Sequence, residues 1–240
     1  MKALTLIMPY YDNPFMLEEQ QRLWAKLPEE LRSRLHVIVV DDCSPRWPAL
    51  PHVRPLAELG LASFRLYKTL VDVRWNWLFC RNLGVSEAET EWVFMTDMDH
   101  VLPRKSLAYI LDAKLDPNAA YRMSRVDAPD NTPYKPHPNT WLMTRALFDK
   151  IGGYDERFSG FYGTDGEFRR RVQDTTGDRI VVLSQAMVRY PRDVIPDAST
   201  TTYERKAPQD KTNVRRIFLE RKGEGVWKTK RLTFPYERQV

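Results

Sequence analysis

Two pairs of acidic residues directly follow apolar segments of the chain: Asp41-Asp42, and Asp97 with Asp99. Open parallel sheets bind ligands beyond the carboxyl ends of their strands. We therefore expect both pairs at one edge, where four carboxylates repel one another unless cations or donors separate them. Oxygen ligands suit Mg²⁺ and Mn²⁺, so the Asp-x-Asp turn predicts a divalent metal shared with phosphate oxygens. Asp41 or Asp42 would then accept hydrogen bonds from a nucleobase or a ribose.

Each of these features also has a purely structural explanation. Two acids after a strand commonly form a turn or a helix cap, and a single Asp-x-Asp is a weak signal. His100, next to the second pair, is of a type that more often satisfies buried hydrogen bonds than binds a metal. The functional argument therefore depends on the order and spacing of several features together.

Strand and helix patterns alternate through the first half and predict the elements that position the acids. Continuous apolar runs predict strands buried on both faces. This βαβαβ order predicts an α/β fold with a mostly parallel sheet and helices on both faces. We expect strands at 4–8, 36–40, 64–67, 92–96, 119–123, 140–144, 180–183 and 186–189, helices from 14 and over 74–87, 145–151, 164–174 and 211–222, and a proline-rich loop over 127–138.

Composition narrows the class of protein. The chain has 240 residues, of which 42% are hydrophobic, enough for one large domain. No apolar run reaches the roughly 18 residues of a membrane-spanning helix, and the apolar N-terminal stretch reads as a strand rather than a signal peptide. Cys43 and Cys80 imply no disulfide framework or CxxC metal site, so a cytoplasmic location is expected.

Positive charge gathers at the C-terminal end. Residues 203–240 hold eleven Lys and Arg against five Asp and Glu, whereas the whole chain carries +5, so the rest is about neutral. This excess predicts a polyanionic partner, either DNA or an anionic membrane surface to which the protein is peripheral. Aromatic residues interleave with the charges and suit both partners. A solvated helix face is the alternative. The aromatic residues are Phe218, Trp227, Phe234 and Tyr236.

Short motifs along the chain resemble those of family 2 glycosyltransferases with the GT-A fold, with a galactosyltransferase-type region in the C-terminal half. The resemblance covers about residues 3–193. It implies a GT-A domain over 1–202, with a nucleotide-binding half at about 1–103 and an acceptor and catalytic half at about 104–202, followed by a basic extension over 203–240. The motifs are PYYDN at 9–13, DDCS at 41–44, RNLG at 81–84, DMD at 97–99, GGYDE at 152–156 and FSGFYGTDGEF at 158–168.

The resemblance also assigns roles to residues. It implies an inverting transferase that uses a nucleotide-diphosphate sugar, a UDP-sugar by family, with Mn²⁺ or Mg²⁺. Asp165 matches the catalytic base, and Glu167 matches a second acid that binds an acceptor or donor hydroxyl. It places Asp97 and Asp99 at the diphosphate and metal site, with Asp99 as a metal ligand, and His100 beside them is the second candidate ligand. The implied donor-binding residues are Pro9, Tyr11, Asp41, Asp42, Arg81, Asp97 and Trp141, the last by stacking or by shaping the acceptor site.

The role of Asp165 also has a physical basis. An acceptor hydroxyl that attacks an anomeric carbon must lose its proton as the bond forms, and a nearby carboxylate takes it. A single base opposite the leaving group implies direct displacement with inversion. The alternative is that Asp165 and Glu167 are acids that decorate a helix N-terminus, where the helix dipole favours them.

Two positions depart from the family pattern. Thr164 stands where relatives have Glu before the base, and Tyr190 stands where many have a late histidine that binds the metal. His100 could substitute for that histidine, or Arg189 and Arg192 could offset diphosphate charge. These departures keep open a second reading, a non-catalytic sugar- or nucleic-acid-binding module.

Two further questions concern the enzyme class and the acceptor. A nucleotidyltransferase is disfavoured, because residues 9–14 contain none of the glycines of a phosphate loop. The acceptor stays open between a glycan, a lipid-linked sugar and a modified DNA base.

Overall fold

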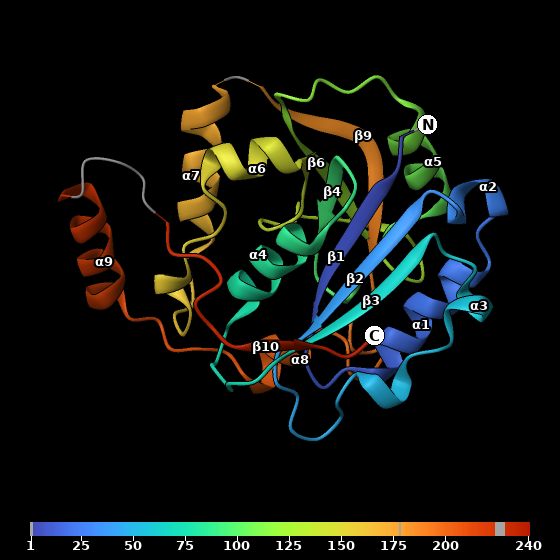
Figure 1. Cartoon of the computed structure of the whole chain (residues 1–240), viewed down its shortest axis with the longest axis horizontal. Coiled ribbons are helices and arrows are strands. Elements are labelled where there is room, and N and C mark those ends of the chain that lie inside the picture. The colour runs from blue at the N-terminus through green and yellow to red at the C-terminus, as the bar shows by residue number, and fades with distance from the viewer. Residues whose placement is uncertain (1, 178, 224–228) are drawn as a thin grey trace.

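The computed structural model describes residues 2–177, 179–223 and 229–240, and Figure 1 shows their arrangement. Over these residues, ten strands form one sheet in the order β10-β3-β2-β1-β4-β8-β6-β9-β5, with β7 paired to β6. Helices surround the sheet, so the predicted α/β architecture is confirmed.

Four parallel strands form the centre of the sheet. Helices cover both of their faces, so nearly all of their side chains are buried and the sequence reads as continuous apolar runs. Because the carboxyl ends of parallel strands point the same way, the acids that follow the second and fourth strands lie along one edge, as predicted. The strands are β1 (Leu4–Tyr10), β2 (Leu35–Asp41), β3 (Ser63–Thr69) and β4 (Trp92–Met95).

The sheet continues beyond β4 with mainly antiparallel strands. β8 (Trp141–Thr144) pairs with β4, and β6 (Ala120–Asp127) follows it. β9 (Ile180–Arg189) runs parallel to β6 and replaces the two strands expected at 180–183 and 186–189, with an irregular register between them. β5 (His100–Val101) pairs with β9, and the expected loop contains a short strand, β7 (Thr132–Tyr134).

The helices divide between the two faces of the sheet, and each set buries its own apolar cluster. No helix of the described residues is long and apolar enough to cross a membrane. One face carries α1 (Pro14–Ala25), α2 (Glu29–Arg32), α3 (Leu56–Leu59) and α5 (Arg104–Asp112), the other carries α4 (Trp77–Glu87), α6 (Arg145–Ile151), α7 (Asp165–Thr176) and α9 (Lys211–Gly223), and α8 (Thr200–Glu204) lies in the connection to α9.

Helix α4 begins at Trp77 rather than at the expected residue 74. Trp75 has a left-handed φ of 60°, so a right-handed helix cannot run through it. Gly84 of α4 lies against β1: a Cβ there would stand 2.3 Å from Ile7 Cγ2. The absent side chain lets α4 approach the sheet closely. Arg81, one turn earlier, thereby reaches the end of β4.

Residues 203–240 pack onto this body at several points. β10 (Tyr236–Arg238) pairs antiparallel with β3 at the sheet edge, and Ile217 of α9 joins the apolar cluster beside α4. Arg221 of α9 is buried and forms ion pairs with Asp155, at 3.0 Å, and with Glu167. Trp227, one of the interleaved aromatic residues, lies outside the described residues.

Candidate active site

A cavity of about 380 Å³ lies beyond the carboxyl end of β4. Asp97, Asp99 and His100 line it from the turn after β4, and Pro9 lines it from β1. Asp165, the first residue of α7, lines the same cavity. The fold thus gathers in one place residues that the sequence predicted separately for the metal, the donor and the base.

Asp97 is held from two sides. Arg81 Nη2 donates to its Oδ1 at 2.5 Å, and His137 Nε2 lies 3.0 Å from its Oδ2. Burial opposes ionisation of this carboxyl, but His137 and Arg81 outweigh burial and hold its pKa below the usual range. The side chain is 39% exposed, so Asp97 is a carboxylate that a ligand can still reach.

His137 is oriented by a hydroxyl. Burial lowers the pKa of His137, so the ring is neutral at pH 7. Its Nδ1 lies 2.9 Å from Thr140 Oγ1. The tautomer that donates from Nε2 to Asp97 accepts at Nδ1 from this hydroxyl, which satisfies both nitrogens.

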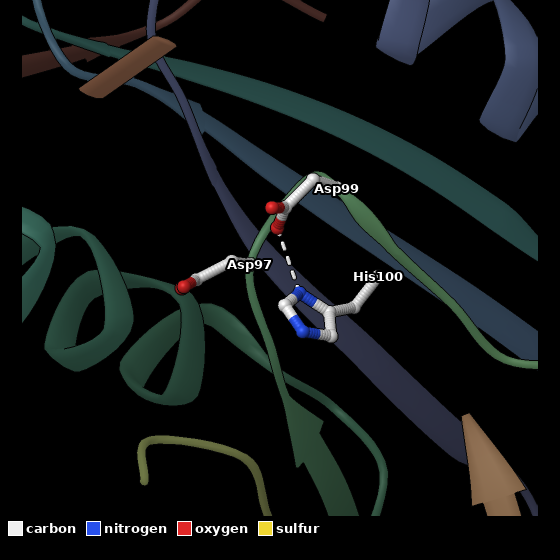
Figure 2. A group of neighbouring side chains, drawn as sticks. All are labelled: Asp97, Asp99 and His100. Carbon is white, nitrogen blue, oxygen red and sulfur yellow. Dashed lines mark hydrogen bonds and ion pairs between the residues drawn. The ribbon is translucent and has the colours of Figure 1, made fainter. Parts of the chain in front are cut away.

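Asp99 is oriented by His100, as Figure 2 shows. His100 Nδ1 lies 2.7 Å from Asp99 Oδ1, and Arg125 Nη1 donates to His100 Nε2 at 2.7 Å. Because arginine only donates, His100 accepts at Nε2 and donates from Nδ1 to Asp99. Burial opposes ionisation of Asp99, but His100 outweighs it and lowers the pKa. Ser199 donates to the other carboxylate oxygen.

The acids after β4 fit a divalent metal. Asp97, Asp99 and His100 offer ligand atoms that all lie within 4.8 Å of one another. Two ionised carboxylates are the donor set that Mg²⁺ and Mn²⁺ take in proteins. His100 Nδ1 could join them only by releasing the proton that it donates to Asp99. The two carboxylates are therefore the primary ligands that this arrangement offers.

Asp165 is connected to the same network. Asn139 Nδ2 donates to Asp165 Oδ1 at 2.7 Å, and the backbone oxygen of Asn139 accepts from Arg81 Nη1 at 2.6 Å. Arg81 therefore links Asp97 to the residue that holds Asp165. Among the described residues, no hydrogen bond reaches Asp165 Oδ2, which leaves one carboxylate oxygen available to a ligand.

Glu167 and Trp141 lie away from this cavity. Arg171 donates to both oxygens of Glu167, at 2.7 and 2.8 Å, and Arg221 also pairs with this buried carboxylate. Trp141 is 1% exposed and packs edge-on against Phe168. Neither residue is among the described residues that line the cavity with Asp97. Glu167 is held by its ion pairs, and Trp141 is packed in the core.

Asp41 and Asp42 make their contacts with other residues of the protein. Asp41 accepts from two backbone N–H groups of the following loop, both at 2.8 Å, as a turn-forming acid does. Asp42 pairs with Arg205 at 2.5 Å, and burial raises the pKa of Asp42 to about 7 although Arg205 opposes this. The Arg205 guanidinium also lies 4.1 Å from the centre of the Tyr11 ring. A nucleobase at these expected positions would have to displace Arg205 or bind beside it.

Position 190, where the resemblance places a late histidine, lies beside Asp99. The Tyr190 backbone N–H donates to the Asp99 backbone oxygen at 2.9 Å, but the Tyr190 hydroxyl donates to Glu19 Oε1 at 3.2 Å. Arg189 pairs with Asp127 at 2.6 Å and lines the cavity. The tyrosine ring is therefore directed away from the candidate metal ligands.

Arg125 of β6, which donates to His100, was not predicted, and neither were four residues from irregular segments: His137, Asn139, Ser199 and Arg205. No periodicity signals a position in such segments. One signal was available for His137 and Asn139. Because β8 runs antiparallel to β4, the residues just before β8 lie beside the end of β4.

Similar solved structures include glycosyltransferases of the GT-A fold. The chain is 18% identical to S. aureus TarS 1-349 in complex with UDP-GlcNAc, with a TM-score of 0.56 over 80% of this chain and 59% of that one. It is 21% identical to the mannosyltransferase PcManGT from Pyrobaculum calidifontis in complex with GDP-Man and Mn²⁺, with a TM-score of 0.57 over 78% of this chain and 56% of that one. It is 11% identical to GalNAc-T7 with UDP, GalNAc and Mn²⁺, with a TM-score of 0.58 over 80% of this chain and 44% of that one.

These comparisons define the class by fold: the chain has the GT-A fold and spans less than two thirds of the length of each of these three proteins. A search of curated proteins finds no match. The family model for glycosyl transferase family 2 matches residues 5–190. The chain belongs to glycosyl transferase family 2, as its motif order predicted.

Proposed function

We propose that this protein transfers a sugar from a nucleotide-diphosphate donor, a UDP-sugar, to an acceptor hydroxyl with inversion at the anomeric carbon. One observation carries the proposal: Asp97 and Asp99 share a cavity with Asp165. A donor diphosphate beside the first two would place its sugar within the cavity that the third also lines. The bound UDP-GlcNAc and UDP of the TarS structures support a UDP donor.

Asp165 is the general base in this proposal. Its free oxygen takes the proton of the acceptor hydroxyl as that oxygen attacks, while Asn139 keeps the carboxylate in place. Asp97 and Asp99, and His100 after loss of its Nδ1 proton, would hold Mn²⁺ or Mg²⁺. Such a metal offsets the charge of the departing diphosphate. Arg81 fixes Asp97 and the backbone of Asn139 together, so the donor and base positions are coupled.

Four more residues belong to the proposed donor site. Arg81 acts by positioning Asp97, and Pro9 borders the donor. Asp42 and Tyr11 would contact the nucleoside only after Arg205 moves. A glycan, a lipid-linked sugar and a modified DNA base are the candidate acceptors, in a cytoplasmic setting. The alternative function is a sugar- or nucleic-acid-binding module without catalysis.

The test is an assay of donor hydrolysis with UDP-Glc, UDP-Gal, UDP-GlcNAc and GDP-Man. The released nucleoside diphosphate is the quantity measured. Asp165→Asn should lower the rate by about 10²- to 10⁴-fold, the usual contribution of a general base, with unchanged nucleotide affinity. Asp174→Asn, an exposed acid on the same helix, is the matched control.

Inversion predicts a β-sugar product from an α-linked donor, which NMR detects. An α product, or an unaffected Asp165→Asn variant, would contradict the proposed mechanism. Nucleotide binding without any hydrolysis or transfer would favour the non-catalytic module.

A further inference from the structure

A second cavity, of about 610 Å³, lies between α7 and α9. Its volume falls within the roughly 300–1,000 Å³ of small-molecule sites. It adjoins the proposed active site, because Thr164 and Gly166 line it while Asp165, between them in the chain, lines the first cavity. One side comes from Gly163, Thr164, Gly166, Glu167 and Arg170, and the other from Arg215, Phe218 and Leu219, three residues on one face of α9.

The cavity has an excess of positive charge. Arg170 and Arg215 both line it, and within the described part of the chain neither forms an ion pair or a side-chain hydrogen bond. The one acid in the lining, Glu167, is already paired with Arg171 and Arg221. Two arginines therefore line the cavity without a counter-charge from the other lining residues, which favours an anionic ligand.

A buried hydroxyl adds a second polar contact. Thr164 is 3% exposed and lines the cavity, and its Oγ1 has no hydrogen-bond partner in the described residues. A buried hydroxyl without a partner is costly, and because Thr164 Oγ1 has almost no exposed surface, a ligand oxygen would accept from it once the cavity wall shifts. Thr164 directly precedes the proposed base in the chain, so the two cavities are lined by consecutive residues.

Beside Arg215, the wall formed by α9 is apolar. Leu219 is 59% exposed, and Phe218 beside it packs on Phe158 at a ring-centre distance of 5.2 Å. A leucine this exposed at the rim of a basic cavity suits a ligand that joins an anionic group to an apolar one. Two arginines beside an apolar rim also make a compact site, unlike the extended basic track and stacking platform that a nucleic acid strand requires.

We propose that this cavity binds the phosphate headgroup of a lipid acceptor, and that a separate free hydroxyl of the same lipid reaches Asp165 in the adjoining cavity. The phosphate contacts Arg170, Arg215 and the Thr164 hydroxyl, and the apolar part of the lipid leaves along Leu219. This inference rests on the proposed function for its link to transfer. The binding of a phosphate lipid is separable from it and is tested alone.

The experiment measures association of the full chain with phosphatidylcholine vesicles that contain or lack phosphatidic acid. Replacing both arginines by glutamine should weaken binding to the phosphatidic acid vesicles by about 30-fold, or about fivefold for each charge. Thr164→Val should weaken binding without loss of stability, because the hydroxyl has no hydrogen-bond partner in the described residues. Arg104→Gln with Lys105→Gln removes two exposed charges on α5, far from α9 in Figure 1, and is the matched control.

Soluble glycerol 3-phosphate distinguishes the cavity from a charged surface. It should compete for the cavity and release the protein from the vesicles. Equal losses in the arginine pair and in the control, no preference for phosphatidic acid, or no competition would overturn the proposal. Nucleotide binding by the same proteins reports on the first cavity: its absence in the wild type would count against the proposed transferase and leave the vesicle result to stand alone.

Discussion

Glu156 joins the C-terminal segment to the core, and its replacement by glutamine is a direct test of that contact. The buried carboxylate accepts four hydrogen bonds, all at 2.7 Å. Asn82 Nδ2 and the backbone N–H of Leu232 donate to Oε1, and the backbone N–H and hydroxyl of Thr233 donate to Oε2. Asn82 follows Arg81, so the same carboxylate steadies the helix turn that reaches Asp97.

Glutamine keeps one of the two side-chain oxygens. An amide NH₂ group, which only donates, replaces the other oxygen. If that oxygen stays with Asn82 and Leu232, the Thr233 N–H faces another donor and loses its acceptor. An unsatisfied buried donor costs about 1–3 kcal/mol, and the remaining bonds lose their charge assistance. Thr233 is exposed, so water recovers part of this. We expect a net loss of about 2 kcal/mol, or about 4–8 °C in Tm for a domain of this size.

Urea denaturation of wild type and Glu156→Gln measures this loss. Glu237→Gln, the same chemical change at an exposed position of β10, is the control and should stay within about 0.5 kcal/mol. If Glu156→Gln matched that control, the C-terminal segment would not be bound to the core through this carboxylate.

Two further predictions concern α4 and the buried acid Asp42. Gly84→Ala brings a Cβ against Ile7, and overpacking of about 1–3 kcal/mol should exceed the helix-propensity gain of about 1 kcal/mol, so urea denaturation should show a net loss. Burial raises the pKa of Asp42 from 3.8 to about 7, so the folded protein holds this proton more tightly than the unfolded chain. The stability that the protonated carboxyl contributes is therefore fully present below pH 3.8 and is lost as the pH rises to about 7. Asp42→Asn should remove that part of the pH dependence, and an unchanged pH profile would contradict it.

The sheet and the acids after β4 follow from sequence for a physical reason. Strands buried on both faces must be apolar throughout, so Asp97 and Asp99 stand out where burial ends. Asp165 is predictable only through the motif around it, because an acid at the start of a helix is common for structural reasons. The α7 dipole favours that acid whether or not it acts as a base.

The partners of these acids were not predictable in the same way. His137 and Arg205 reach Asp97 and Asp42 through loop and short-helix geometry that no periodicity encodes. Trp141 shows the opposite limit, since a tryptophan that could stack on a ligand and one that fills the core look alike in sequence. Only its 1% exposure separates the two.

The central claim is that Asp97 and Asp99 hold a metal-bound nucleotide. Calorimetry of UDP and other nucleoside diphosphates, with and without Mn²⁺, tests it on wild type, Asp99→Ala and the exposed control Asp193→Ala. The account predicts metal-dependent binding of UDP in wild type and control, weakened more than about tenfold in Asp99→Ala. Binding that ignores the metal and survives Asp99→Ala, or no nucleotide binding at all, would contradict it.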